Sequence, residues 1–114
     1  HSVGNQTLDQ IRERAENIVG NLKSAKLSFA AVSTMSTVGG GTLPKARIPS
    51  AGIELTHKLM SATKLQLELL HKPATPIASK IEDEKLLIDL RTIPECEDHY
   101  LYETLSGLEG KIST

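Results

Sequence analysis

Apolar residues recur with two different periods along the first third of the chain. Between Thr7 and about Lys26 they are spaced by three or four residues, which predicts one buried face of an α-helix. These positions are Leu8, Ile11, Ala15, Ile18 and Leu22. Thr7 and Gln10 have the spacing of a capping box, which predicts where the helix begins. From Leu27 to Thr37 apolar and polar residues alternate, and this period of two predicts a strand.

The same two periods organise the middle and the end of the chain. Residues 51–56 alternate again and predict a second strand. Residues 61–71 are rich in leucine and precede prolines, which predicts a short helix. Pro94 is followed by an acidic turn that suits the positive end of a helix, so we expect the final helix to begin there and to stop at Gly110.

Residues 77–82 and 86–93 predict a β-hairpin around the turn at residues 82–85. Placing Ile81 opposite Leu86 gathers the apolar side chains on one face, which is what determines hairpin register. The predicted core face carries Ile77, Ile81, Leu86, Ile88 and Leu90. The predicted polar face carries Lys80, Leu87, Asp89 and Arg91.

The order of elements is helix, strand, strand, helix, strand, strand, helix. Hairpin-type connections favour an α+β fold, with an antiparallel four-stranded sheet and helices packed on one face. The 114 residues suffice for one core, so we expect a single domain over residues 1–114.

Composition excludes several classes of function. The net charge is −1, from 13 basic and 14 acidic residues, and only 3% of residues are aromatic. A chain of this kind lacks the basic surface and the stacking platforms of an autonomous nucleic-acid-binding domain. No apolar run predicts a membrane helix, and a single cysteine, Cys96, fits a reducing compartment. We therefore expect a soluble cytoplasmic domain with no membrane partner.

Two groups of residues are candidates for a binding site. Arg91 and Lys80 lie on the polar face of the hairpin, where a guanidinium can bind a carboxylate or phosphate through two parallel hydrogen bonds. Lys80 and Asp89 are placed to meet diagonally. The alternative is a solvated face whose surface ion pairs contribute little.

The second candidate is a glycine-rich loop, predicted to contact a ligand or a neighbouring domain. Its residues are Gly39, Gly40, Gly41, Leu43 and Pro44. Glycine permits sharp turns and close approach, although a plain turn would use the same residues. The loop lacks the lysine ending and the flanking elements of a phosphate-binding loop.

The remaining chemically active side chains do not form a catalytic group. His57, His71 and His99 are not at metal-ligand spacing, so no metal site is predicted. Cys96 has acidic neighbours that oppose thiolate formation, and no histidine nearby in sequence to activate it.

Two ordered segments resemble a known enzyme family. Gly39 to Pro44 and then Ile48-Pro49-Ser50 are similar to the glycine-rich segment of bacterial selenocysteine synthase, L-seryl-tRNA(Sec) selenium transferase. The stretch from Pro76 to Ile93 resembles that family's second signature, in which a proline-rich entry leads into a strand, a turn and a second strand. The second strand of that signature corresponds to Ile88-Asp89-Leu90-Arg91-Thr92 in this chain.

The resemblance implies the small C-terminal domain of a fold-type-I pyridoxal-phosphate enzyme. Such an enzyme converts seryl-tRNA(Sec) to selenocysteyl-tRNA(Sec) by eliminating water and adding selenium. The cofactor lysine of the family lies in a Ser-Gly-Asp-Lys segment that this chain does not contain. We therefore expect the catalytic domain to lie outside this chain, and the chain alone to bind no pyridoxal phosphate and to be inactive.

The implied partners are the protein's own large domain, seryl-tRNA(Sec) and further copies in a homo-oligomer. Arg91 is implied to bind the substrate's carboxylate in the cleft between the two domains, with Lys80 supplying a second positive charge for an anionic donor. Lys80 stands where the family has arginine, so it keeps the charge and loses the planar fork. Two alternatives stay open: a same-fold lyase acting on a small amino acid or amino sugar, and a non-catalytic interaction or oligomerisation module.

Overall fold

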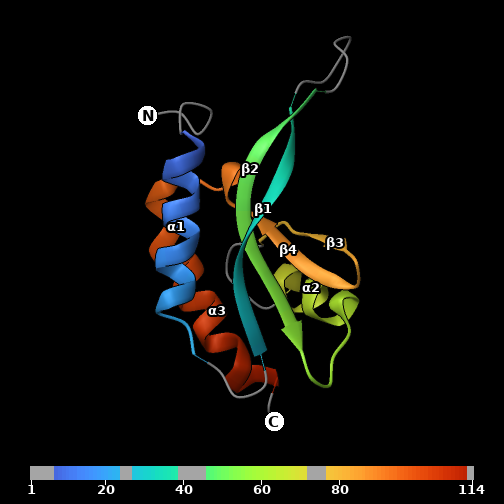
Figure 1. Cartoon of the computed structure of the whole chain (residues 1–114). Coiled ribbons are helices and arrows are strands. Elements are labelled where there is room, and N and C mark those ends of the chain that lie inside the picture. The colour runs from blue at the N-terminus through green and yellow to red at the C-terminus, as the bar shows by residue number, and fades with distance from the viewer. Residues whose placement is uncertain (1–6, 24–26, 39–45, 72–76, 113–114) are drawn as a thin grey trace.

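A computed structural model describes residues 7–23, 27–38, 46–71 and 77–112. Three helices and four strands make up these residues, together with two 3₁₀ turns (Figure 1). In chain order they are α1 (Leu8–Gly20), β1 (Leu27–Val38), β2 (Ala46–His57), α2 (Ala62–His71), β3 (Lys80–Glu82), β4 (Lys85–Asp89), η2 (Leu90–Thr92), η3 (Glu95–Glu97) and α3 (Asp98–Ile112).

The strands form one antiparallel sheet in the order β1-β2-β4-β3. Ile53 lies opposite Ile88, and Ile81 lies opposite Leu86, so the hairpin register predicted from alternation is confirmed. The predicted α+β class with a four-stranded antiparallel sheet is confirmed as well.

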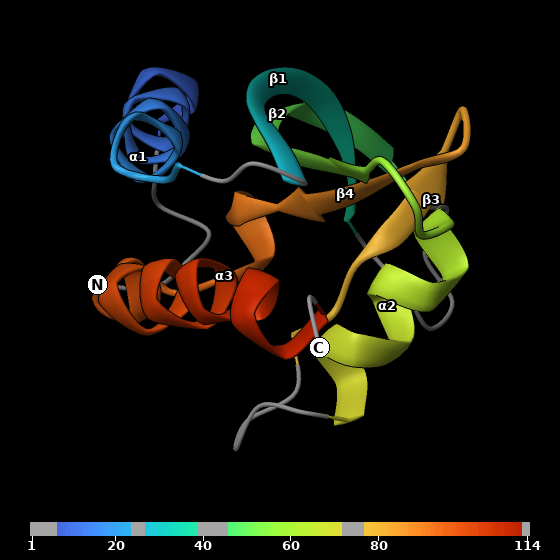
Figure 2. The ribbon, with the colours of Figure 1, turned by 90° about the horizontal axis from the view of Figure 1, so that it is seen from below.

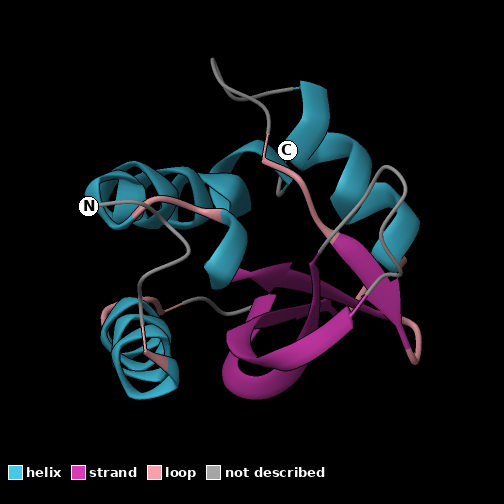
Figure 3. Cartoon of the chain, turned by 90° about the horizontal axis from the view of Figure 1, so that it is seen from above, coloured by secondary structure: helices cyan, strands magenta, loops and turns pink. Residues whose placement is uncertain are grey.

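One hydrophobic core joins the three helices to one face of the sheet. Its fully buried side chains come from every helix and from the two central strands, because alternate residues of a strand share a face. They include Ile11, Ile53, Leu55, Leu65, Leu69, Leu86, Ile88, Leu101 and Leu105. Figures 2 and 3 show the helices gathered to one side and the strands curving on the other.

Helix α1 begins as predicted and ends earlier than predicted. The Gln10 amide donates to Thr7 Oγ1 at 3.2 Å, and the Thr7 amide donates to Gln10 Oε1 at 2.9 Å, which completes the capping box. The helix ends at Gly20 rather than near Lys26, because the amides of Asn21 and Leu22 bond carbonyls only three residues back and tighten the last turn.

Strand β2 begins at Ala46, five residues before the predicted start, and it includes Pro49. Pro49 lies opposite Met35 of β1, whereas β4 pairs with β2 only along Gly52–Leu55. A proline has no N–H to donate, so it is tolerated where a strand has a neighbour on one side only.

The second hairpin is shorter than predicted. Strand β3 begins at Lys80 rather than Ile77, and β4 ends at Asp89 rather than Ile93. Asp83 and Glu84 both have positive φ, at 52° and 64°, as a two-residue hairpin turn requires. Ile81 is 40% exposed, contrary to its predicted core position, because the three-residue strand β3 forms an edge of the sheet.

The last helix also differs from its predicted bounds. The acidic turn after Pro94 forms η3, and α3 begins at Asp98. The helix continues through Gly110 to Ile112, so the predicted stop at Gly110 is wrong.

Candidate functional site

The sheet is coiled so strongly that its two edge strands, β1 and β3, come into contact on the face opposite the core. Lys80 of β3 donates from Nζ to the carbonyl oxygen of Met35 in β1 at 3.1 Å. Lys80 also lies 3.4 Å from Glu82. Twist accumulates from strand to strand, so a four-stranded sheet can bring its first and last members together on one side.

Inside this coil lie four buried side chains, two of which, Leu87 and Asp89, belong to the polar face predicted from alternation. We call them the coiled face: Ser36, Ser50, Leu87 and Asp89, which are 3%, 1%, 4% and 9% exposed. The prediction that Leu87 and Asp89 share a face with Lys80 is confirmed. The alternative of a solvated face is wrong for these two residues, which are buried. Curvature of the sheet, which alternation does not encode, accounts for the difference.

Asp89 is the central polar group of the coiled face. Its Oδ1 accepts hydrogen bonds from Ser50 Oγ at 2.5 Å and from the Arg91 amide at 3.0 Å. Its carbonyl oxygen accepts from Thr92 Oγ1 at 2.7 Å. These bonds cap η2 and turn the chain out of β4, because aspartate at an N-cap satisfies an amide that the turn leaves without a partner.

Arg91 therefore lies in a 3₁₀ turn rather than on the predicted strand. Its Nη2 donates to the carbonyl oxygen of Pro49 at 2.6 Å, and the residue is half-buried. Because Pro49 is directly opposite Met35, Arg91 and Lys80 bind the two carbonyls of a single rung of the β1–β2 ladder. Each of the two predicted binding residues thus contacts the backbone of the β1–β2 ladder, Lys80 on β1 and Arg91 on β2. The predicted diagonal meeting of Lys80 with Asp89 gives way to contacts of Lys80 with Met35 and Glu82.

Gly52 allows β2 and β4 to approach closely beside this group. It lies opposite Asp89, and a Cβ at this position would overlap the Ile88 carbonyl oxygen. Only a residue without a side chain fits between the strands here.

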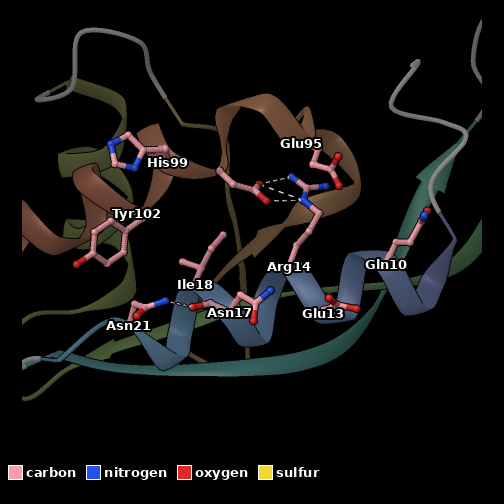
Figure 4. A pocket seen from close by; sticks show the side chains of 10 residues that line it. Gln10, Glu13, Arg14, Asn17, Ile18, Asn21, Glu95, His99 and Tyr102 are labelled. Atoms are coloured by element: carbon pink, nitrogen blue, oxygen red, sulfur yellow. Dashed lines mark hydrogen bonds and ion pairs between the residues drawn. The ribbon is translucent and has the colours of Figure 1, made fainter.

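A second polar region lies between α1 and α3, on the other side of the molecule from the curved strands. It is a groove of about 790 Å³, and Figure 4 shows its side chains. The groove is lined by Gln10, Glu13, Arg14, Asn17, Ile18, Asn21, Glu95, Asp98, His99 and Tyr102.

Arg14 forms the floor of the groove, and sequence reasoning did not identify it. It is 5% exposed, and its Nε and Nη2 bind the Asp98 carboxylate at 2.6–3.0 Å. Nη1 donates to the Leu90 carbonyl at 3.1 Å, and Nη2 donates to the Ile93 carbonyl at 2.8 Å. A signal was present, since Arg14 lies one turn from both Ile11 and Ile18 on the apolar stripe of α1.

The groove does not fit pyridoxal phosphate. Its lining, as far as the described residues form it, contains no lysine, and Glu13 and Glu95 would repel the phosphate group of the cofactor. Arg14 in this lining is bound to Asp98. We therefore derive no step of cofactor chemistry from the side chains of this chain.

The other predicted features have definite outcomes where the structure describes them. Cys96 is exposed. Within the described ranges, no three metal-binding side chains of His, Cys, Asp or Glu cluster, and no helix has the length and apolar character needed to span a bilayer. The loop residues Gly39, Gly40, Gly41, Leu43 and Pro44 lie outside the described residues.

Comparison with known proteins identifies relatives along most of the chain. The family model described as L-seryl-tRNA selenium transferase matches residues 2–94. The chain is 34% identical over 102 residues to the L-seryl-tRNA(Sec) selenium transferase of Alkaliphilus metalliredigens, covering 88% of this chain and 22% of that protein. Its identity to the Aliarcobacter butzleri protein of the same name is 34% over 104 residues, which covers 91% of this chain and 22% of that protein.

A third relative, from Alkaliphilus oremlandii and with the same name, is 40% identical over 90 residues, which is 77% of this chain and 19% of that protein. The chain spans about a fifth of the length of the curated relatives it matches. Since the family model covers most of the sequence, including both segments that carried the resemblance, the chain belongs to the L-seryl-tRNA selenium transferase family.

Proposed function

We propose that this chain is the C-terminal domain of a pyridoxal-phosphate-dependent L-seryl-tRNA(Sec) selenium transferase. The family match over residues 2–94 is the observation that carries the proposal. The cofactor and its lysine would belong to the part of the enzyme outside this chain, and the chemistry that pyridoxal phosphate would supply there is activation of the seryl group. The serine hydroxyl leaves as water, selenium joins the same carbon, and water cleaves the Se–P bond of the donor to release phosphate.

The role of this domain in that reaction is to supply positive charge to the substrate site. Arg91 is the binding residue, and Lys80 is the second cation. Lys80 binds the Met35 carbonyl and Arg91 binds the carbonyl of Pro49, the residue paired with Met35, and the Arg91 backbone is held by a buried carboxylate. A guanidinium anchored in this way suits an oxyanion that it can bind through two hydrogen bonds.

The chemistry of the substrates decides which anion Arg91 binds. The carboxyl group of a seryl residue on tRNA is an ester and carries no charge. The selenium donor, a selenophosphate-type anion, is charged throughout the reaction. Arg91 therefore binds the donor when the substrate is seryl-tRNA.

The alternative function is a same-fold lyase acting on a small amino acid, whose carboxylate is free. The lysine at position 80, where the family has arginine, is the observation that keeps this alternative in view. The two functions differ in which substrate loses affinity when Arg91 is changed: the selenium donor in the transferase, and the amino acid in the lyase.

The test uses the full-length enzyme with pyridoxal phosphate, seryl-tRNA(Sec) and selenophosphate, and it measures selenocysteyl-tRNA. Seryl-tRNA(Ser) is the control substrate. Absence of product from seryl-tRNA(Sec), together with turnover of a free amino acid, would replace the transferase by the lyase. The Arg91→Lys and Arg91→Met variants are expected to raise the donor KM while the KM for seryl-tRNA is unchanged.

The assembly and compartment follow from the same proposal. The full-length enzyme is a cytoplasmic homo-oligomer in which this domain contacts its own large domain. The chain of 114 residues alone is expected to show no pyridoxal-phosphate absorbance after incubation with the cofactor and dialysis.

A further inference from the structure

Four residues around Arg91 form a closed ring of contacts. The Arg91 side chain donates to the Pro49 carbonyl, and the Arg91 amide donates to Asp89 Oδ1. Asp89 Oδ1 also accepts from Ser50, which follows Pro49 directly in β2. The side chain of Arg91 is thus bound to Pro49 directly, and its backbone amide is linked to Ser50 through Asp89.

The part of this ring that holds the backbone is shielded from water. Ser50 is 1% exposed and Asp89 is 9% exposed, whereas the guanidinium contact with Pro49 is exposed to solvent. A hydrogen bond in a buried environment is electrostatically stronger and holds its geometry better than one in water. The buried half of the ring therefore determines where the Arg91 side chain leaves the backbone, and the hydrogen bond from Nη2 to Pro49 lies at the solvent-exposed end of the side chain.

We infer that Asp89 and Ser50 are positioning residues that hold Arg91 in its anion-binding orientation. This inference rests on the proposed role of Arg91 in binding the selenium donor. Arginine has several rotatable bonds, and fixing its backbone and its direction in advance lowers the entropy lost when an anion binds. Asp89 acts through the acceptor oxygen rather than through its negative charge, which by itself would disfavour an anion nearby.

The difference between the acceptor oxygen of Asp89 and its negative charge separates a positioning role from a general structural one. Asparagine at position 89 keeps an oxygen that can accept from both Ser50 and the Arg91 amide, and it removes the charge. Alanine at position 89 removes both the acceptor oxygen and the charge. In the full-length enzyme we expect Asp89→Ala and Ser50→Ala to raise the selenophosphate KM by about tenfold, with kcat changed less than about threefold. We expect Asp89→Asn to have a KM at or below that of the wild type.

Ser36→Ala provides the matched control. Ser36 is 3% exposed on the same coiled face, and it lies on β1 rather than in the ring. Loss of the Ser36 hydroxyl is expected to leave the selenophosphate KM unchanged even if the melting temperature falls. An increase in KM for Ser36→Ala equal to that for Ser50→Ala would overturn the inference.

A double-mutant cycle completes the test. If Asp89 acts through Arg91, then Asp89→Ala made in the Arg91→Met background raises the donor KM no further. Additive effects of the two substitutions would refute positioning, and so would an increase in KM for Arg91→Met that Asp89→Ala and Ser50→Ala fail to reproduce. An unchanged donor KM in Arg91→Met alone has a different meaning, since it rejects the proposed role of Arg91 and the inference that depends on it.

Discussion

Two arginines join distant parts of this chain, and they do so in opposite ways. Arg14 on α1 is buried, and its guanidinium is surrounded by the Asp98 carboxylate and two backbone carbonyls from the η2–η3 region. Arg91 in η2 is half-buried, and its guanidinium donates to a backbone carbonyl in a solvent-exposed hydrogen bond. The first arrangement connects a helix to a helix, and the second connects a turn to a strand.

The difference shows which part of each arginine the fold holds. In the groove the fold holds the guanidinium of Arg14 itself, so this group serves packing and is not available for a ligand. On the coiled face the fold holds the backbone of Arg91 through Asp89 and leaves the guanidinium contact exposed to solvent. The groove between α1 and α3 is therefore built on the structural arginine, while the candidate binding arginine lies outside it.

The largest effect on stability is expected at Arg14. Arg14→Met leaves the Asp98 carboxylate and two carbonyls without the donor that satisfies them. Breaking a buried ion pair from one side costs about 3–5 kcal/mol, and we expect the lower end of this range because the Asp98 side chain is 27% exposed and water can reach it. Urea unfolding of the 114-residue chain measures this loss. Asp98→Asn keeps an acceptor for Arg14 and is expected to cost less. An Arg14→Met variant as stable as the wild type would show that the groove is not held together by this contact.

The next effect is expected at Gly52, where β2 and β4 approach closely beside the coiled face. Gly52→Ala places a methyl group against the backbone of Ile88, which cannot move without disturbing β4, and overpacking of this kind costs about 1–3 kcal/mol. Gly107→Ala is the matched control, because no atom of a neighbouring element lies within 4 Å of its Cβ position. That helical substitution is expected to stabilise the chain by about 1 kcal/mol. Equal destabilisation by both substitutions would contradict the close approach of β2 and β4.

A smaller effect is expected at Arg91. Arg91→Met removes a solvent-exposed donor, and water can take its place at the Pro49 carbonyl, so the loss of stability is expected to be below about 1.5 kcal/mol. Thermal melts beside those of Arg14→Met provide the comparison. If Arg91→Met is as destabilising as Arg14→Met, both arginines stabilise the fold to the same extent. The distinction between a structural Arg14 and a binding Arg91 would then be wrong.

The smallest effect is expected at the hairpin turn, and it has the opposite sign. Glu84 has φ of 64°, a conformation that glycine adopts without the penalty incurred by a residue with a Cβ. Glu84→Gly is expected to stabilise the chain by about 0.5–1 kcal/mol, measured as a shift in the urea midpoint. Glu84→Ala separates backbone strain from charge, because it removes the carboxylate and keeps the Cβ. A gain in Glu84→Ala that equals the gain in Glu84→Gly would point to charge repulsion with Asp83.

Much of the fold was predictable from local patterns. The capping box at Thr7 and the register that places Ile81 opposite Leu86 were both confirmed, because each depends on residues close together in sequence. The bounds of β2 and β4 were less predictable. Pro49 is compatible with a strand only because β4 does not reach it, and the end of β4 depends on Asp89 bonding to Ser50, 39 residues away.

The candidate site was predictable only as a set of residue types. Sequence alternation indicated correctly that Lys80 and Asp89 share a face, and the family resemblance drew attention to Arg91. The sequence did not indicate that Lys80 binds a carbonyl of β1 and Arg91 a carbonyl of β2. It also did not indicate that Arg14 is buried against Asp98, 84 residues away.

By itself, the sequence determined the kinds and order of the elements, the hairpin pairing and the family, because periodicity, turn residues and signatures are properties of neighbouring positions. Tertiary structure alone decided which polar residues are buried and which are exposed. The coil of the sheet and the packing of α1 on α3 are sums of small twists and contacts over the whole chain, so no local segment records them.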